Sequence, residues 1–500
     1  MNRTNSIKGE LLNLKDKIEQ IAKDQGLDFD PVVFEVCDYE TINILAAQGG
    51  FPSRYPHWRF GMEYEQISKN YAYGLQKIYE MVVNTNPVYA YLLSSNDLVD
   101  QKIVMSHVFG HADFFKNNLW FSKTNRKMMD VMANNATKIR RYMGQYGIDK
   151  VENFIDRVIS IDNLIDINLL LTDFHQKHKL EDEENEEPKD NSKHKAEYLQ
   201  SYLRSEKKQK EKAQGIEKEG QSKDKEPKIK KFPEQPQRDI MLFLLENAPL
   251  EEWQADIIGI LREESYYFLP QMMTKIMNEG WASYWHTTLM TEKMIEAGEL
   301  VDFCDRNAGV LQMGRQQINP YKIGIELFKD IEDRWNKGRF GKEYQECDGL
   351  KEKGNWDLKL GEGRGKIFEV RKLHNDVTFI DEFLTKEFCQ RAKLFTYKYN
   401  PRHGRFEIDS KDFEAIRQKL LAQLTNFGQP LIEIEDGNYG NRSELLLAHH
   451  HFGIDLDTKY AADTMNAIYG IWKRPVNLRT KYDDKEVIFC FNGKELLPLK

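Results

Sequence analysis

Two histidines four residues apart are the feature of this sequence that points most directly to chemistry. His107 and His111 lie in the stretch 86–118, NPVYAYLLSSNDLVDQKIVMSHVFGHADFFKNN. On a helix, residues four apart share one face with their Cβ atoms about 5–6 Å apart, so both imidazoles can reach one metal ion. The same spacing is also common among histidines that only make hydrogen bonds in a protein core. The pair therefore predicts either a metal site or two structural histidines.

A third metal ligand is available in a second predicted helix, residues 277–287, MNEGWASYWHT. Glu279, Ser283 and His286 fall on one face of that helix, at positions i, i+4 and i+7. Two imidazoles and one carboxylate, with one open position, form a common catalytic zinc set. We therefore expect Glu279 to bind zinc with the two histidines, and His286 to support them or to face the substrate. The alternative is a core helix whose glutamate only forms a cap or a salt bridge.

The position after the first histidine departs from the zinc-peptidase pattern HExxH, in which a glutamate there is the general base. Here that residue is Val108. If a metal activates water, the base must come from elsewhere. Glu63 and Glu65, in RFGMEYEQ, are the nearest candidates by character, and the alternative is that they begin a surface helix. Asp113 points off the metal-binding face, and we expect it to support a neighbouring element.

Two further segments carry polar side chains suited to holding a substrate. GGFPSRYPHWRFG contains Arg54 and His57, which could bind a carboxylate or an amide. GRQQINPYKIG contains Arg315, Asn319 and Tyr321. The alternative for the second segment is a capped turn between helices, with its proline starting the second helix.

Particular elements are needed to bring these residues together. PVYAYLLS predicts a strand, SSND offers helix N-caps, and residues 98–115 predict a helix that Gly110 weakens. Zinc peptidases also place a strand directly before the metal-binding helix, and its edge pairs with extended substrates. Residues 238–335 predict further helices. We therefore expect an α+β protein whose N-terminal region is mainly helical and zincin-like, with a short strand or hairpin before the active-site helix.

Composition divides the chain into segments. Residues 181–231 hold 14 acidic and 14 basic residues, by count, and few apolar ones. Because so little apolar surface cannot offset the entropy of ordering, we expect a charged, disordered insertion over 181–237. It would separate an N-terminal helical region, 1–180, from its helical continuation, 238–360.

The C-terminal pattern predicts a smaller α+β domain over 361–500. KLFTYKY, PLIEIED, ELLLAHHHF, VNLRTKY and EVIFCFN are rich in β-branched and aromatic residues and predict strands. KDFEAIRQKLLAQLTNFG and TKYAADTMNAIYGIWK predict amphipathic helices, the first with Gly428 as a C-cap.

Composition also excludes several classes of protein. The 72 basic and 80 acidic residues leave a net charge of −8, which argues against a uniformly basic nucleic-acid binder. Five scattered cysteines form no CxxC pair, so neither a disulfide framework nor a cysteine-rich zinc site is expected. The first residues contain no apolar signal segment, and no apolar run is long enough to span a membrane. We therefore expect a cytoplasmic protein.

Three long motifs, GGFPSRYPHWRFGMEYE, HVFGHADFFKNN and NEGWASYWH, together with the later INPY, resemble the stage V sporulation protein R family. The resemblance covers nearly the whole chain outside the charged insertion. It implies a bacterial cytosolic protein needed to form the peptidoglycan cortex of the spore, and it implies no particular reaction.

Two functions are compatible with these residues. The first is a zinc-dependent hydrolase resembling the gluzincin peptidases, acting on a peptide or peptidoglycan-precursor amide, with Glu63 or Glu65 as base. The second is a non-catalytic assembly or regulatory scaffold, with or without a structural metal, that binds a protein partner through the C-terminal domain.

Overall fold

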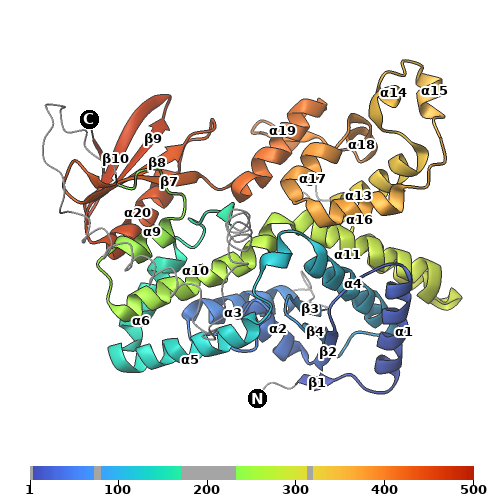
Figure 1. Ribbon diagram of the computed structural model, residues 1–500, viewed down its shortest axis with the longest axis horizontal. Helices are drawn as coiled ribbons and strands as arrows, with labels where there is room; N and C mark the ends of the chain where they lie inside the picture. Colours follow the sequence, from blue (N-terminus) through green and yellow to red (C-terminus); the bar gives the residue numbers. More distant parts are fainter. Residues whose placement is uncertain (1–3, 73–79, 170–231, 312–318, 500) are drawn as a thin grey trace, which may run out of the picture. The chain divides into compact units, whose positions relative to one another are not determined.

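A computed structural model describes residues 4–72, 80–169, 232–311 and 319–499 (Figure 1). The chain forms two compact units: unit 1 contains residues 1–138 and 267–428, and unit 2 contains residues 139–266 and 429–500. The chain thus leaves unit 1 and later returns to it. The region 361–500, expected as one domain, is divided between the two units at Gln429. Most of the expected insertion, residues 181–231, lies outside the described residues.

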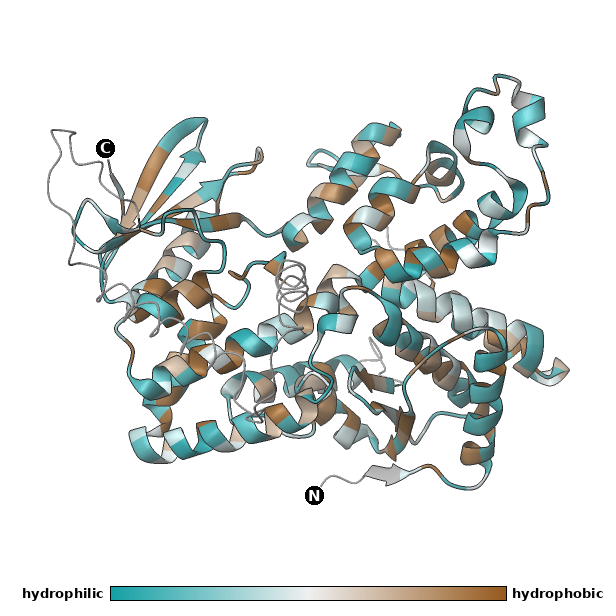
Figure 2. Ribbon diagram, viewed as in Figure 1, coloured by the Kyte–Doolittle hydropathy of each residue, from teal (hydrophilic) through white to brown (hydrophobic). Residues whose placement is uncertain are grey.

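A four-stranded sheet lies at the centre of the N-terminal part of unit 1. Its order is β1-β2-β4-β3, with β2 and β4 parallel and the other neighbours antiparallel. The strands are β1 (Thr4–Ser6), β2 (Val32–Cys37), β3 (Glu80–Val83) and β4 (Val88–Leu93). The hairpin β3–β4 directly precedes the histidine-bearing helix, as predicted, and β2, β3 and β4 carry much apolar sequence (Figure 2). The sequence patterns did not predict β1 and β2.

Helix α4 (Leu98–Asn117) carries His107 and His111 and is buried on almost all sides. Its N-cap is Asp97, whose carboxylate accepts a hydrogen bond from the backbone N–H of Asp100 at 2.9 Å. From Val99 to Phe115 every side chain except that of Ile103 is buried. This explains why the helix shows no one-sided apolar stripe, since it packs against the sheet and several helices at once.

Helix α11 (Lys275–Leu289) packs between α4 and α13 (Pro320–Lys337) at very short range. A Cβ atom on Gly110 of α4 would lie 2.7 Å from Cα of Ala282, and one on Gly280 would lie 2.4 Å from Cα of Gly324. Side chains larger than hydrogen at these two glycines would push the helices apart. The glycine that weakens α4 in isolation therefore permits its contact with α11.

The rest of unit 1 is largely helical. Residues 363–391, at the start of the region expected as a C-terminal α+β domain, form the helices α16 (Gly363–Leu373), α17 (Asp376–Phe383) and α18 (Lys386–Arg391). The predicted strand KLFTYKY is β5 (Thr396–Asn400), paired with β6 (Arg405–Ser410). Helix α19 (Phe413–Leu424) ends before Gly428, and its C-cap is Thr425. The other helices are α1 (Glu10–Asp24), α2 (Tyr39–Ala47), α3 (Trp58–Ala72), α12 (Leu300–Val310), α14 (Gly341–Gln345) and α15 (Leu350–Gly354). Two helices, α5 (Met128–Tyr146) and α10 (Glu252–Met273), have residues in both units.

Unit 2 contains a five-stranded sheet of order β11-β10-β9-β8-β7. The four strand predictions from PLIEIED onward are confirmed as β7 (Leu431–Tyr439), β8 (Glu444–His450), β9 (Val476–Tyr482) and β10 (Lys485–Phe491), and β11 (Leu496–Leu499) follows. β8 and β9 are parallel, so the predicted helix α20 (Thr458–Trp472) is their crossover. Helices α6 (Ile148–Ile159) and α9 (Ile240–Asn247) complete the unit. Among the described residues, no helix combines the length and apolarity that crossing a membrane requires.

Candidate metal centre

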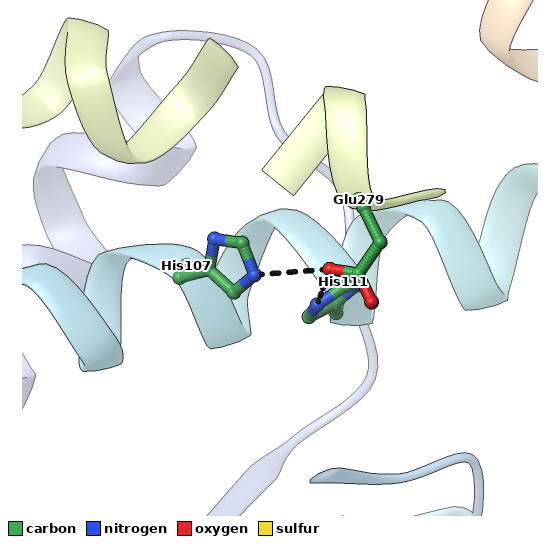
Figure 3. Close-up of side chains that lie close together, drawn as sticks. All are labelled: His107, His111 and Glu279. Carbon is green, nitrogen blue, oxygen red and sulfur yellow. Dashed lines mark ion pairs between the residues drawn. The ribbon is translucent and has the colours of Figure 1, made fainter. Parts of the chain in front are cut away.

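His107, His111 and Glu279 converge in unit 1, from two helices far apart in the sequence (Figure 3). One possible ligand atom of each lies within 4.8 Å of the others, and both histidines are buried. Each imidazole Nε2 lies 3.5 Å from the same carboxylate oxygen, Oε2 of Glu279. Among the described residues, this is the one group of three or more His, Cys, Asp or Glu side chains with such spacing.

The spacing fits a shared metal ion better than it fits direct hydrogen bonds. Good hydrogen bonds to a carboxylate from a charged nitrogen are about 2.7–2.9 Å long, and Oε2 of Glu279 is buried with no hydrogen-bond partner among the described residues. Ligands on a tetrahedral zinc ion with bonds of about 2.1 Å lie about 3.4 Å apart. Two nitrogens and one oxygen are also a donor set that zinc accepts. The residues present therefore fit a zinc ion.

The second nitrogen of each histidine ring has its own protein partner. Nδ1 of His111 lies 2.9 Å from Oδ1 of Asn278, which can only accept, so the ring donates from Nδ1. Nδ1 of His107 lies 3.1 Å from Nδ1 of His286, whose Nε2 lies 3.1 Å from Oδ1 of Asn307. Since the asparagine oxygen accepts, His286 donates from Nε2 and accepts at Nδ1 when neutral. Both metal-site histidines then carry their proton on Nδ1 and offer the lone pair of Nε2 to the metal.

The electrostatics of the centre are those of one ionised carboxylate among buried imidazoles. Burial would raise the pKa of Glu279, but His107 and His111 more than reverse this, so the pKa lies well below its usual range. Burial also lowers the pKa of His107, and the charge of His111 adds to that effect. Burial lowers the pKa of His286 to about 3, and nearby His107 contributes. His286 is therefore neutral near pH 7, as its role as an acceptor requires.

Tyr321 and Glu80 also interact with residues of the centre. Tyr321, from the INPY motif at the start of α13, interacts electrostatically with Glu279, and its ring centroid lies 6.2 Å from that of His107. Burial, followed by the charges of Glu279 and Glu80, raises the pKa of Tyr321. Glu80 is the first residue of β3, and its charge interacts with those of His111 and Glu279. No sequence motif had singled out Glu80.

The two glutamates predicted as bases have other partners. Both lie on helix α3, where Glu63 pairs with Arg59 at 2.8 Å and Glu65 pairs with Lys69 at 3.6 Å. Neither belongs to the metal-binding group found among the described residues. Their position matches the surface-helix alternative, and their role as base stays a prediction.

The predicted substrate-binding residues lie in different settings. Arg54 donates to the carbonyl of Gln48 at 3.2 Å and lies 5.0 Å from the ring centroid of Phe60, while His57 is buried. Asn319 caps α13 by accepting from the N–H of Lys322, which matches the capped-turn alternative. Tyr321 interacts electrostatically with Glu279 and lies beside His107. Arg315 lies outside the described residues.

Asp113 supports a neighbouring element, as predicted. Its buried carboxylate accepts from Nη1 of Arg371 at 2.7 Å, from Nε1 of Trp281 at 2.8 Å and from the backbone N–H of Asp28 at 2.8 Å. It thereby joins α4 to α11 and α16. Sequence reasoning missed Asn278, although it directly precedes Glu279, because a side-chain amide has no distinctive spacing.

Known proteins resemble this chain over most of its length. A relative described as "Uncharacterized protein YcgB" from Escherichia coli (strain K12) is 28% identical over 503 residues, which cover 94% of this chain and 92% of that protein. No solved structure gives a significant match. The family model described as SpoVR like protein matches residues 6–429, a range that includes every residue of the metal centre. The chain therefore belongs to the SpoVR family.

Proposed function

We propose that this protein is a zinc-dependent hydrolase in which His107, His111 and Glu279 bind the metal. The observation that carries the proposal is the pair of 3.5 Å distances from the two Nε2 atoms to one buried, otherwise unpartnered oxygen of Glu279. Three protein ligands leave a fourth zinc position for water or substrate, which is the pattern of catalytic rather than structural zinc sites. A zinc ion so bound polarises a carbonyl group and lowers the pKa of its bound water towards 7.

We infer the substrate class from the process that the family serves. Membership of the SpoVR family supports a role associated with sporulation. Within such a role, formation of the spore cortex offers amide bonds in peptides and peptidoglycan precursors. We propose that these amides are the substrates, and that the strand–helix arrangement before the site resembles that of gluzincin peptidases.

Metal analysis of untagged protein tests the proposal. We expect about one zinc per chain in wild-type protein and a loss of at least tenfold in zinc affinity in His107→Ala and in Glu279→Gln. The matched control is His403→Ala, because this histidine lies on the β5–β6 turn and pairs with Glu407. Circular dichroism checks that each variant is folded.

Three results would contradict the proposal in different ways. Folded wild-type protein that holds no metal after dialysis against zinc has no such site. Zinc bound equally well by wild-type and Glu279→Gln would mean that the ion lies elsewhere. If zinc is bound as proposed but muropeptides and peptidoglycan precursors stay intact, the scaffold function with a structural metal takes the place of the hydrolase.

A further inference from the structure

A hydrolase built on this centre needs a base that α4 does not provide. Val108 occupies the position of the base in HExxH, and its side chain is fully buried in the core. A residue from another element must therefore face the open side of the metal. The inference below rests on the proposed function and concerns that residue.

The side chain of Glu80 lies on the face of β3 that packs towards α4. In β3, Met81 and Val83 pack in the apolar cluster that contains α2 residues, whereas Val82 packs in the cluster that contains α4 residues. Because side chains alternate along a strand, Glu80 shares the α4 face with Val82. Its charge interacts with those of His111, Glu279 and Tyr321, which all border the metal position.

Glu80 lies near the centre without belonging to the ligand set. The ligand atoms of His107, His111 and Glu279 all lie within 4.8 Å of one another, and Glu80 is not part of that group. A carboxylate that is not a ligand can act on a water molecule at the open position of the metal. Burial raises the pKa of Glu80 to about 7, an effect that His111 opposes and Glu279 reinforces.

We propose that Glu80 is the general base of this site and takes the role that glutamate has after the first histidine in HExxH. Its carboxylate removes a proton from the attacking water while the water oxygen bonds to the amide carbon and the carbonyl π electrons move onto oxygen. The protonated Glu80 then gives that proton to the amide nitrogen as the C–N bond breaks. The products are a carboxylic acid and an amine, Glu80 ends as it began, and nothing is oxidised or reduced.

Binding of acetohydroxamic acid to the zinc-loaded full-length protein tests this assignment without knowledge of the substrate. A hydroxamate binds zinc as its anion. A base beside the metal accepts the proton that the hydroxamate loses, and the protonated base then donates a hydrogen bond to the bound anion. Isothermal titration calorimetry in buffers of different ionisation enthalpy gives both the affinity and the number of protons released. We expect Glu80→Gln to keep its zinc, to bind the hydroxamate at least tenfold more weakly and to release about one more proton to the buffer.

Glu35→Gln is the matched control, because Glu35 is a partly buried glutamate in strand β2 of the same sheet. It should bind the hydroxamate as wild type does. Unchanged affinity and proton release in Glu80→Gln would overturn the proposal, as would a tenfold loss in Glu63→Gln or Glu65→Gln instead. Loss of zinc from Glu80→Gln would make Glu80 a ligand and would also overturn it. Wild-type protein without zinc would instead show failure of the proposed function itself.

Discussion

The orientation of each imidazole decides what the metal centre can bind. A histidine offers a lone pair from one nitrogen only while the other nitrogen carries the proton, so a partner for Nδ1 selects the Nε2 tautomer. His111 has Asn278 in this role, and His107 has His286, which is itself oriented by Asn307. These partners come from α11 and α12, so both helices orient the candidate ligands through side chains outside the ligand set.

Removing the acceptor behind His111 should weaken the site without removing a ligand. We expect Asn278→Leu to raise the zinc dissociation constant about 10- to 100-fold, because His111 loses the hydrogen bond that fixes its ring. Asn278→Asp keeps an acceptor at the same position and should restore most of the affinity. Competition with a chromophoric chelator measures both constants. Equal affinity in wild type and Asn278→Leu would show that the hydrogen bond does not orient the ligand.

At the scale of elements, the site depends on where α11 begins and how closely it packs. Asp376, the first residue of α17, accepts hydrogen bonds from the N–H groups of Ile276 and Met277 at 2.8 and 2.9 Å. These are among the N–H groups that the first turn of a helix leaves without partners. This contact fixes the first turn of α11, the helix that carries Glu279.

Asp376 should make the stability of the fold depend on pH. Burial raises the pKa of Asp376 to about 7, despite its two N–H donors. A raised folded-state pKa means that the folded protein binds the proton more tightly than the unfolded chain does. The contribution of Asp376 is therefore most favourable below about pH 4 and is lost as the pH rises to about 7, at about 1.4 kcal/mol per pKa unit. Urea unfolding at pH 5 and pH 8 should show a smaller fall in stability for Asp376→Asn than for wild type, and equal falls would contradict this.

The close approach of α4 and α11 gives a second prediction at this scale. Gly110→Ala places a methyl group 2.7 Å from the backbone of Ala282, so the helices must separate. Alanine favours a helix by about 1 kcal/mol over glycine, but overpacking costs about 1–3 kcal/mol or more, so we expect a net loss of stability and weaker zinc binding. Gly144→Ala on α5 is the control, because nothing lies within 4 Å of its added Cβ. A Gly110→Ala variant as stable as wild type, with unchanged zinc affinity, would contradict this packing.

Local sequence patterns predicted those site residues whose arrangement follows from spacing within a single helix. The Asp97 cap and the spacing of His107 and His111 define α4, and helical periodicity places Glu279 and His286 on one face of α11. Glu80 could not be found in this way, because its place beside the centre depends on β3 pairing with β4. Strand pairing is a contact between segments, and no spacing within either segment records it.

The same limit explains the domain boundaries. A change from helical to strand-like patterns predicted a division near residue 361, yet α16, α17 and α18 complete unit 1. Asn118 of the N-terminal region donates to the carbonyl of Arg371 in α16 at 2.8 Å, which ties the two segments together. Local composition does not reveal which distant segment a helix packs against, so the actual division at Gln429 was not predictable from it.

At the scale of the whole molecule, every described residue of the metal centre belongs to unit 1, although residues 139–266 of unit 2 lie between its two parts in the sequence. A ligand that binds only the folded state stabilises it by an amount set by its concentration relative to its dissociation constant, about 2.7 kcal/mol at a 100-fold excess. Zinc should therefore act first on the unit whose elements hold it. Unit 2 has its own sheet and its own buried residues, among them Ile434, Leu447 and Leu478.

Hydrogen exchange of the full-length protein with and without zinc tests this division. We expect zinc to slow amide exchange in α4 and α11, because they carry the three ligands, and to leave β8 and β9 of unit 2 unchanged. Glu279→Gln serves as the control, since it should show no slowing anywhere at the same zinc concentration. Equal slowing in both units would mean that they unfold as one cooperative body, because a local ligand can protect a distant sheet only if opening the sheet also requires releasing the metal.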